Sequence, residues 1–164
     1  MHNKFIYLKK KLAEALIINN PFPHIEIKNF FSNEDFSEIV SQKEISIPKV
    51  SSDKELLNEL LSLNYKMLEF PGSTTSLKSY LEWHKKRAKQ SNLNNNTCSG
   101  VGITLRLTSV KSKVLLELTD FFKSEIFINL ICDKFKVDIN NCELDFGIQK
   151  YLDGYEISPH PDVR

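Results

Sequence analysis

The sequence predicts an α+β fold in which helices come first and strands follow near the end of the chain. Two observations predict it. Apolar residues recur at helical spacing through much of residues 4–135, whereas the pattern from Glu143 onward is that of strands. At 164 residues, the chain has the length of one domain that can bury a core. We therefore expect a single domain, with residues 1–140 mainly helical and residues 141–164 supplying the first strands of the core sheet.

The first elements follow from apolar spacing and capping residues. Phe5, Leu8, Leu12 and Leu16 predict a helix over Lys4–Ile18. In the stretch PFPHIEIK, two prolines exclude a helix and alternating isoleucines predict a short strand. Two capping boxes then predict helix starts, Ser32 with Asp35 and Ser52 with Glu55.

The remaining elements are expected in an order that leads to the sheet. They are a helix over Leu77–Lys89, a surface loop over Ser91–Gly100, a strand over Val101–Leu107, two helices within Ser109–Phe135 that break near Lys123-Ser124, and strands over Glu143–Tyr151 and Tyr155–His160.

Composition excludes several classes of protein. A hydrophobic fraction of 41% and a charged fraction of 26% are those of a globular protein, and a net charge of +1 argues against a nucleic-acid footprint. No stretch reaches the roughly 18 apolar residues of a membrane span. The three cysteines are odd in number and form no CxxC motif, which favours reduced thiols. We therefore expect a cytoplasmic protein that binds neither nucleic acid nor a membrane.

The segment QKYLDGYEISPHPDVR contains the most informative chemistry. Its His160 and Asp162 form an H-x-D motif at the end of a predicted strand. In an extended chain, side chains two residues apart point to the same face, so an imidazole and a carboxylate would reach one metal ion. Iron(II) accepts this mixture of nitrogen and oxygen ligands and keeps positions open for other molecules.

The order of a tyrosine, a glycine-containing turn, a strand and H-x-D resembles the 2-oxoglutarate/Fe(II)-dependent oxygenase superfamily, in its prolyl 4-hydroxylase-like branch. The stretches PFPHIEIKNFFSNEDFSEIV and LTDFFKSEIFINLICDKFKV are similar to the opening and to the helical support of such enzymes. The resemblance implies N-terminal helices that support an incomplete double-stranded β-helix (jelly-roll) core. It makes His160 and Asp162 iron ligands and makes Tyr151 a residue that binds 2-oxoglutarate.

The resemblance also implies the reaction. Fe(II) and 2-oxoglutarate are the expected cofactors, with ascorbate as a possible reductant, and the activity is that of a dioxygenase that hydroxylates a small molecule or a peptide. The family places a further histidine ligand and an Arg or Lys that pairs with 2-oxoglutarate after H-x-D, whereas this sequence ends at Arg164. We therefore expect a fragment of a longer enzyme that binds iron weakly and turns over little by itself.

Two other classes remain open. One is a non-catalytic protein-binding module derived from the same fold, and the other is a metalloprotein of the cupin type. An incomplete β-helix has open edges, so self-association through the late strands is expected.

Several other polar and aromatic side chains have ordinary structural explanations. We expect Tyr80, Trp83 and His84 to belong to a packed helix face, and His24 to be a structural or surface residue. Arg106 either faces a pocket or is solvated, and we expect solvation.

Overall fold

The computed structural model describes residues 3–47, 49–69, 73–87, 102–139 and 145–151, with side chains described in all but residues 83–87 of these. Its contacts divide the chain into two compact units. The first unit is Met1–Ser46 with Val110–Gly147, and the second is Ile47–Ser109 with Ile148–Arg164. Helices together with an antiparallel sheet confirm the α+β class.

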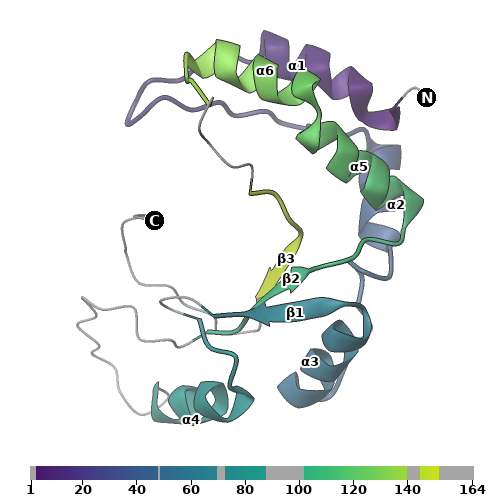
Figure 1. Cartoon of the computed structure of the whole chain (residues 1–164), viewed down its shortest axis with the longest axis vertical. Coiled ribbons are helices and arrows are strands. Elements are labelled where there is room, and N and C mark those ends of the chain that lie inside the picture. The colour runs from purple at the N-terminus through teal and green to yellow at the C-terminus, as the bar shows by residue number, and fades with distance from the viewer. Residues whose placement is uncertain (1–2, 48, 70–72, 88–101, 140–144, 152–164) are drawn as a thin grey trace. The chain divides into compact units, whose positions relative to one another are not determined.

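The described part of the first unit is helical (Figure 1). It contains a 3-10 helix η1 (Lys4–Tyr7) and four α-helices: α1 (Leu8–Glu14), α2 (Asn33–Ser41), α5 (Lys113–Lys123) and α6 (Glu125–Phe135). Apolar side chains from η1, α1, α2 and α5 make its core, because each presents a stripe of buried residues at helical spacing. The most buried are Phe5, Leu8, Leu12, Ile39, Val114, Leu115, Leu118 and Phe121.

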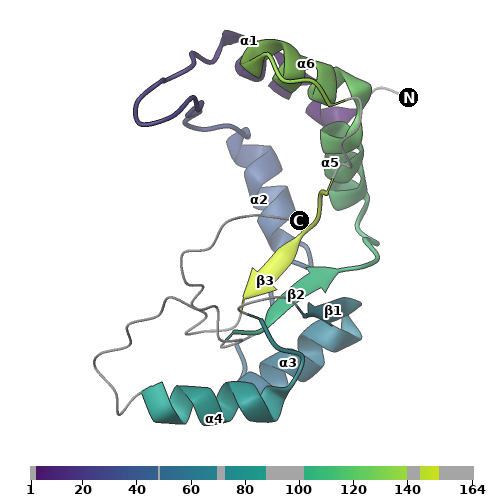
Figure 2. The same ribbon diagram turned by 60° about the vertical axis from the view of Figure 1, so that its left-hand side comes forward.

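The described part of the second unit is a three-stranded antiparallel sheet with two helices. Its elements are α3 (Asp53–Ser62), β1 (Tyr65–Leu68), α4 (Leu77–Arg87), β2 (Thr104–Leu107) and β3 (Gln149–Tyr151), and the strand order is β1-β2-β3. Figures 1 and 2 show α3 and α4 on the same side of this sheet. Buried residues from the helices and strands form its core: Leu57, Leu60, Tyr65, Tyr80, Ile103, Leu105 and Leu107.

Local capping sets several helix boundaries. Ser32 and Ser52 begin α2 and α3, each with its side-chain oxygen accepting from the backbone N–H three residues on. The predicted break between the last two helices is confirmed at Ser124. Its backbone is extended, with ψ at 146°, and its Oγ accepts from the N–H of Phe127 at 3.2 Å. One serine thus ends α5 and begins α6.

The helix predicted over Lys4–Ile18 is shorter than expected. It ends at Glu14, and Leu16, expected on its buried face, is 82% exposed. Lys134 from α6 donates to the carbonyls of Ala13 and Ala15 at 3.0 and 2.6 Å. Because this contact supplies a partner for carbonyls that lack one inside the helix, the chain can leave the helical conformation there.

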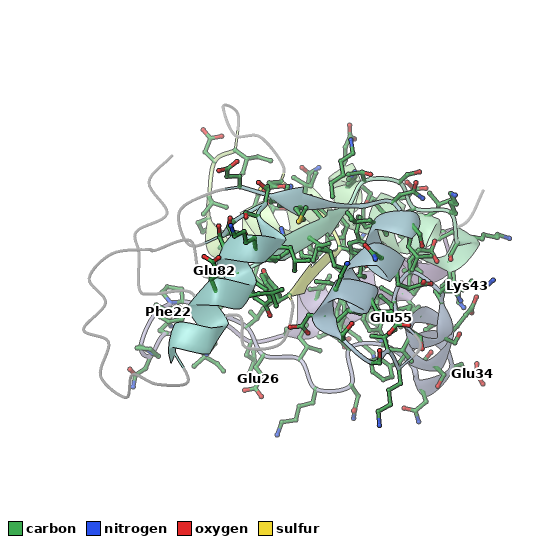
Figure 3. The ribbon with its side chains drawn as sticks, turned by 90° about the horizontal axis from the view of Figure 1, so that it is seen from below. Phe22, Glu26, Glu34, Lys43, Glu55 and Glu82 are labelled. Carbon is green, nitrogen blue, oxygen red and sulfur yellow. The ribbon has the colours of Figure 1, made fainter. Side chains whose placement is uncertain are left out.

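The strand predicted around Ile25 and Ile27 was wrong for the described chain. Instead, Ile18 and His24 form an isolated bridge with backbone hydrogen bonds of 2.8 and 2.9 Å. Figure 3 shows Glu26 of this segment extending away from the ribbon. The alternation of apolar and polar residues reflects half-buried Ile25 and Ile27 beside exposed Glu26. It does not make a strand, because no described segment pairs with these residues.

The sheet also departs from the expected order. Strand β1, with the sequence YKML, precedes the strand expected at residues 101–107, so the strands are not confined to the end of the chain. Four residues are too few for a clear alternating pattern. The segment is a strand because it pairs with β2. The strand predicted over Glu143–Tyr151 is present as β3 only at Gln149–Tyr151 among the described residues. Residues 155–160 lie outside the description.

Within the described ranges, no helix is both long enough and apolar enough to cross a membrane.

Candidate functional site

The sheet of the second unit has one apolar and one polar face, and the pairing register defines both. Tyr65 pairs with Leu107, and Leu105 lies between Met67 and Lys150. Directly paired residues of an antiparallel sheet point to the same face. The apolar face therefore carries the buried Tyr65, Leu105 and Leu107, which belong to the core.

The opposite face is polar and consists of two cross-strand rows. In one row Arg106 lies between Lys66 and Gln149, and in the other Thr104 lies between Leu68 and Tyr151. We call this set of six residues the polar face of the sheet. Thr104 is fully buried, Arg106 and Gln149 are half-buried, and Lys66 is exposed.

Tyr151, the predicted 2-oxoglutarate residue, is the last residue of β3 and lies on this polar face. Its side chain is accessible, since the residue is 53% exposed, and its hydroxyl donates to Gln149 Oε1 at 2.8 Å. A phenol has one hydrogen to donate, so Tyr151 can donate to a small molecule only by giving up its bond to Gln149, whereas its oxygen can accept a further hydrogen bond. The prediction that it binds 2-oxoglutarate stays a prediction.

His160 and Asp162, the predicted iron ligands, lie outside the described residues. Among the residues that are described, no group of three or more His, Cys, Asp or Glu side chains is arranged to hold a metal ion. The donor chemistry of the motif fits Fe(II), because an imidazole and a carboxylate are among the three protein ligands of the 2-His-1-carboxylate iron site.

Other predicted residues are placed more clearly. Tyr80 is fully buried, which confirms that it belongs to the core. His24 has its Nδ1 at 2.7 Å from the carbonyl oxygen of Phe22 and packs beside that ring, with 5.3 Å between the centroids. Arg106, expected to be solvated, is half-buried, because it lies on the middle strand with neighbours on both sides.

Sequence reasoning missed Thr104, Gln149 and Lys66 as part of one surface. Alternation along residues 101–107 already places Thr104 and Arg106 on one face. No sequence signal gave the register, because β1 was not predicted and β3 is distant in the sequence.

Lys150 is the one lysine on the apolar face by the register. It pairs with Leu105 and is half-buried. Burial lowers the pKa of its ammonium group, since the charged form loses hydration. A lysine stem at a sheet edge commonly covers apolar surface in this way, so we assign it a packing role.

The first unit contains a cavity of about 420 Å³ whose lining offers no acid, base or charged group. Three phenylalanines and two asparagines line it: Phe30, Phe31, Phe36, Asn29 and Asn33. Its composition suits packing rather than catalysis, and the polar face of the sheet is the better candidate site.

Comparison with protein-family models, with curated proteins and with solved structures finds no match to this chain. The assignment of a function therefore depends on the residues themselves.

Proposed function

We propose that this chain carries the iron-binding strand of an Fe(II)/2-oxoglutarate-dependent dioxygenase with a double-stranded β-helix core. One observation carries the proposal: in the sequence, the H-x-D motif His160-Pro161-Asp162 follows Tyr151 and the pair Asp153-Gly154, which predicts a turn. The accessible position of Tyr151 at the end of β3 supports it, because Tyr151 is the tyrosine that precedes the motif in the resemblance.

In this proposal His160 and Asp162 hold Fe(II), and a third ligand remains to be assigned. When bound, the metal with 2-oxoglutarate and dioxygen supplies the oxidation of a C–H bond: 2-oxoglutarate, O₂ and R–H give succinate, CO₂ and R–OH. Tyr151 would exchange the hydrogen bond it donates to Gln149 for one donated to a 2-oxoglutarate carboxylate. The apolar face of the sheet, which belongs to the core, would hold β3 rigid.

Paramagnetic NMR on the full chain tests the ligand assignment. Mn(II), a redox-stable substitute for Fe(II), is expected to broaden the amide signals of Gln149–Tyr151. Addition of 2-oxoglutarate should increase the affinity for Mn(II), because it adds two oxygen ligands to the metal. His160→Ala and Asp162→Ala should each weaken Mn(II) binding by at least about tenfold, since each removes a direct ligand.

His24→Ala is the matched control, because it removes a histidine from the other unit and should leave Mn(II) binding unchanged. Equal broadening in wild type and His160→Ala would count against the proposal. The alternatives give other results: a binding module shows no metal effect, and a cupin-type protein binds several metals without help from 2-oxoglutarate.

We also propose that the chain self-associates through β3. This strand pairs with β2 on one side and is an outer strand of the described sheet. Outer strands present backbone groups that can pair with another chain. Light scattering should therefore give a mass that rises with concentration, and a monodisperse monomer at high concentration would contradict this.

A further inference from the structure

The cavity of the first unit lies where the chain enters α2, and its walls are aromatic. Phe30 and Phe31 precede the helix, and Phe36 belongs to it. The first two rings meet edge to face, with 5.1 Å between their centroids. Each of them also contacts a further ring, since Phe31 lies 6.0 Å from Phe5 and Phe30 lies 6.4 Å from Phe122. These contacts hold two walls of the cavity in one arrangement.

The backbone at one edge of the cavity is held by a charged group. Lys11 Nζ, on α1, donates to the carbonyl oxygens of Asn29 and Phe30 at 2.6 and 3.0 Å. Asn29 has a φ of 52°, in the left-handed region that asparagine adopts more readily than most residues. The edge of the cavity is therefore formed before a ligand binds, as in most small-molecule sites.

Two side-chain amides of the lining are available to a ligand. Asn29 and Asn33 are exposed, and neither side chain forms a hydrogen bond with a group of the described chain. An amide carries one acceptor oxygen and two donor hydrogens, so it pairs best with an edge that offers a donor beside an acceptor. The ring of Phe36 is also available, because this residue is 56% exposed.

The size and the charge of the cavity narrow the class of ligand. Its volume of about 420 Å³ lies within the range of roughly 300–1,000 Å³ that is usual for small-molecule pockets. A stable protein partner would instead need roughly 20–30 residues on each side. None of the described lining residues is charged, so an ion would lose hydration there without gaining a partner.

We propose that this cavity binds a small, neutral aromatic molecule that carries an amide on its ring. The ring packs against the three phenylalanines, since aromatic pairs gain from edge-to-face and offset contacts. The amide pairs with the side chains of Asn29 and Asn33. The inference does not rest on the proposed dioxygenase activity, because none of these residues takes part in that reaction.

Benzamide is the probe, because its benzene ring and primary amide are the two features that the cavity recognises. In the NMR spectrum of the full chain it should shift the amide signals of residues 29–31 and 33–36. Benzoate, which has a charge in place of the amide, should bind at least about tenfold more weakly. Cyclohexanecarboxamide, which has a saturated ring of similar size, should bind at least about threefold more weakly.

Three variants each remove one recognition group and keep the backbone. Phe36→Ala removes the exposed ring, and Asn33→Ala removes an amide from an exposed helix position. Asn29→Gly removes the other amide, and glycine adopts the left-handed conformation without cost. Each variant should weaken benzamide binding at least about threefold with thermal unfolding still cooperative. Val40→Ala, an exposed apolar residue of α2 outside the described lining, should bind benzamide as the wild type does.

Several results would overturn the inference. One is the absence of any benzamide shift, and another is binding of benzoate or cyclohexanecarboxamide as tight as that of benzamide. Benzamide binding that all three variants leave unchanged would place the ligand elsewhere. Signals of residues 33–36 that move with protein concentration, without ligand, would show that a second copy covers Phe36, and this result would also refute the proposal.

Discussion

Replacing Glu44 by glutamine is expected to lower the free energy of unfolding by on the order of 3 kcal/mol at neutral pH. Glu44 is 6% exposed, and its carboxylate accepts from the N–H groups of Lys111 and Ser112 at 3.1 and 2.9 Å and from Ser112 Oγ at 2.5 Å. These contacts fix the segment that opens α5, whose buried face forms much of the core of the first unit.

The pKa of Glu44 explains the size of the effect. Burial of the carboxyl disfavours its charged form, but the hydrogen bonds from Ser112 and Lys111 together outweigh burial and lower the pKa from 4.5 to about 2. A lowered pKa means that the folded state holds its proton less tightly than the unfolded state. The stabilisation is therefore complete above about pH 4.5 and is lost as the pH falls toward 2.

Chemical denaturation between pH 2 and 7, with amide exchange of α5 as a local measure, checks this expectation. The difference between the wild type and Glu44→Gln should be largest near neutral pH and should vanish near pH 2. Glu14→Gln is the control, because Glu14 is exposed and only 3.8 Å from Lys10 in a surface pair, which contributes little. A pH-independent difference would show that the carboxylate charge is not responsible.

Asp35→Ala is expected to destabilise the first unit by about 2–4 kcal/mol. Asp35 is 6% exposed in the first turn of α2. Its Oδ2 accepts from the hydroxyl of Tyr7 at 2.6 Å, and its Oδ1 lies 2.8 Å from Lys4 Nζ. The alanine variant would remove the acceptor that joins η1 to α2.

Charge at Asp35 strengthens this junction. Burial of the carboxyl opposes ionisation, but the hydrogen bonds from Lys4, Tyr7 and Ser32 outweigh burial and lower its pKa. In turn, two hydrogen bonds raise the pKa of Lys4. The larger effect comes from the bond to Asp35 and the smaller from the bond to Glu38. The ion pair thus persists through the neutral range.

Urea denaturation of Asp35→Ala and of Glu34→Gln gives the matched comparison. Glu34 occupies the same first turn of α2 but is exposed, with its side chain extending from the ribbon (Figure 3). The control should change the free energy of unfolding by less than about 0.5 kcal/mol. Similar losses in the two variants would mean that the helix dipole, rather than the contact with Tyr7 and Lys4, accounts for the role of Asp35.

The sequence predicted features that neighbouring residues decide. The starts of α2 and α3 followed from serines whose side chains accept from a nearby N–H, and the break at Ser124 followed from the change of pattern between two amphipathic stretches. Each of these depends on hydrogen bonds that span three residues. The mixed α+β class followed from the same local periodicities.

The capping boxes were right about the starts but incomplete about the partners. The N–H of Ser32 donates to the Tyr7 hydroxyl, 25 residues away, at 3.1 Å. At α3, the carboxylate of Glu55 accepts from the N–H of Ser51 at 2.9 Å rather than closing the box on Ser52. The capping-box pattern correctly predicted the serine oxygen that accepts at each helix start. The partners of the other capping groups depend on the surrounding structure.

The sequence by itself determined most of the helical segments and where several of their caps lie. It also names His160 and Asp162 as the candidate metal ligands, which stays a prediction. Only the tertiary structure decided the end of α1 at Glu14, the strand β1, the role of Glu44 and the polar face that joins Thr104 and Arg106 to Tyr151. The physical reason is distance along the chain: hydrogen bonds and pairings between remote residues set these features, and no local pattern records the register between strands.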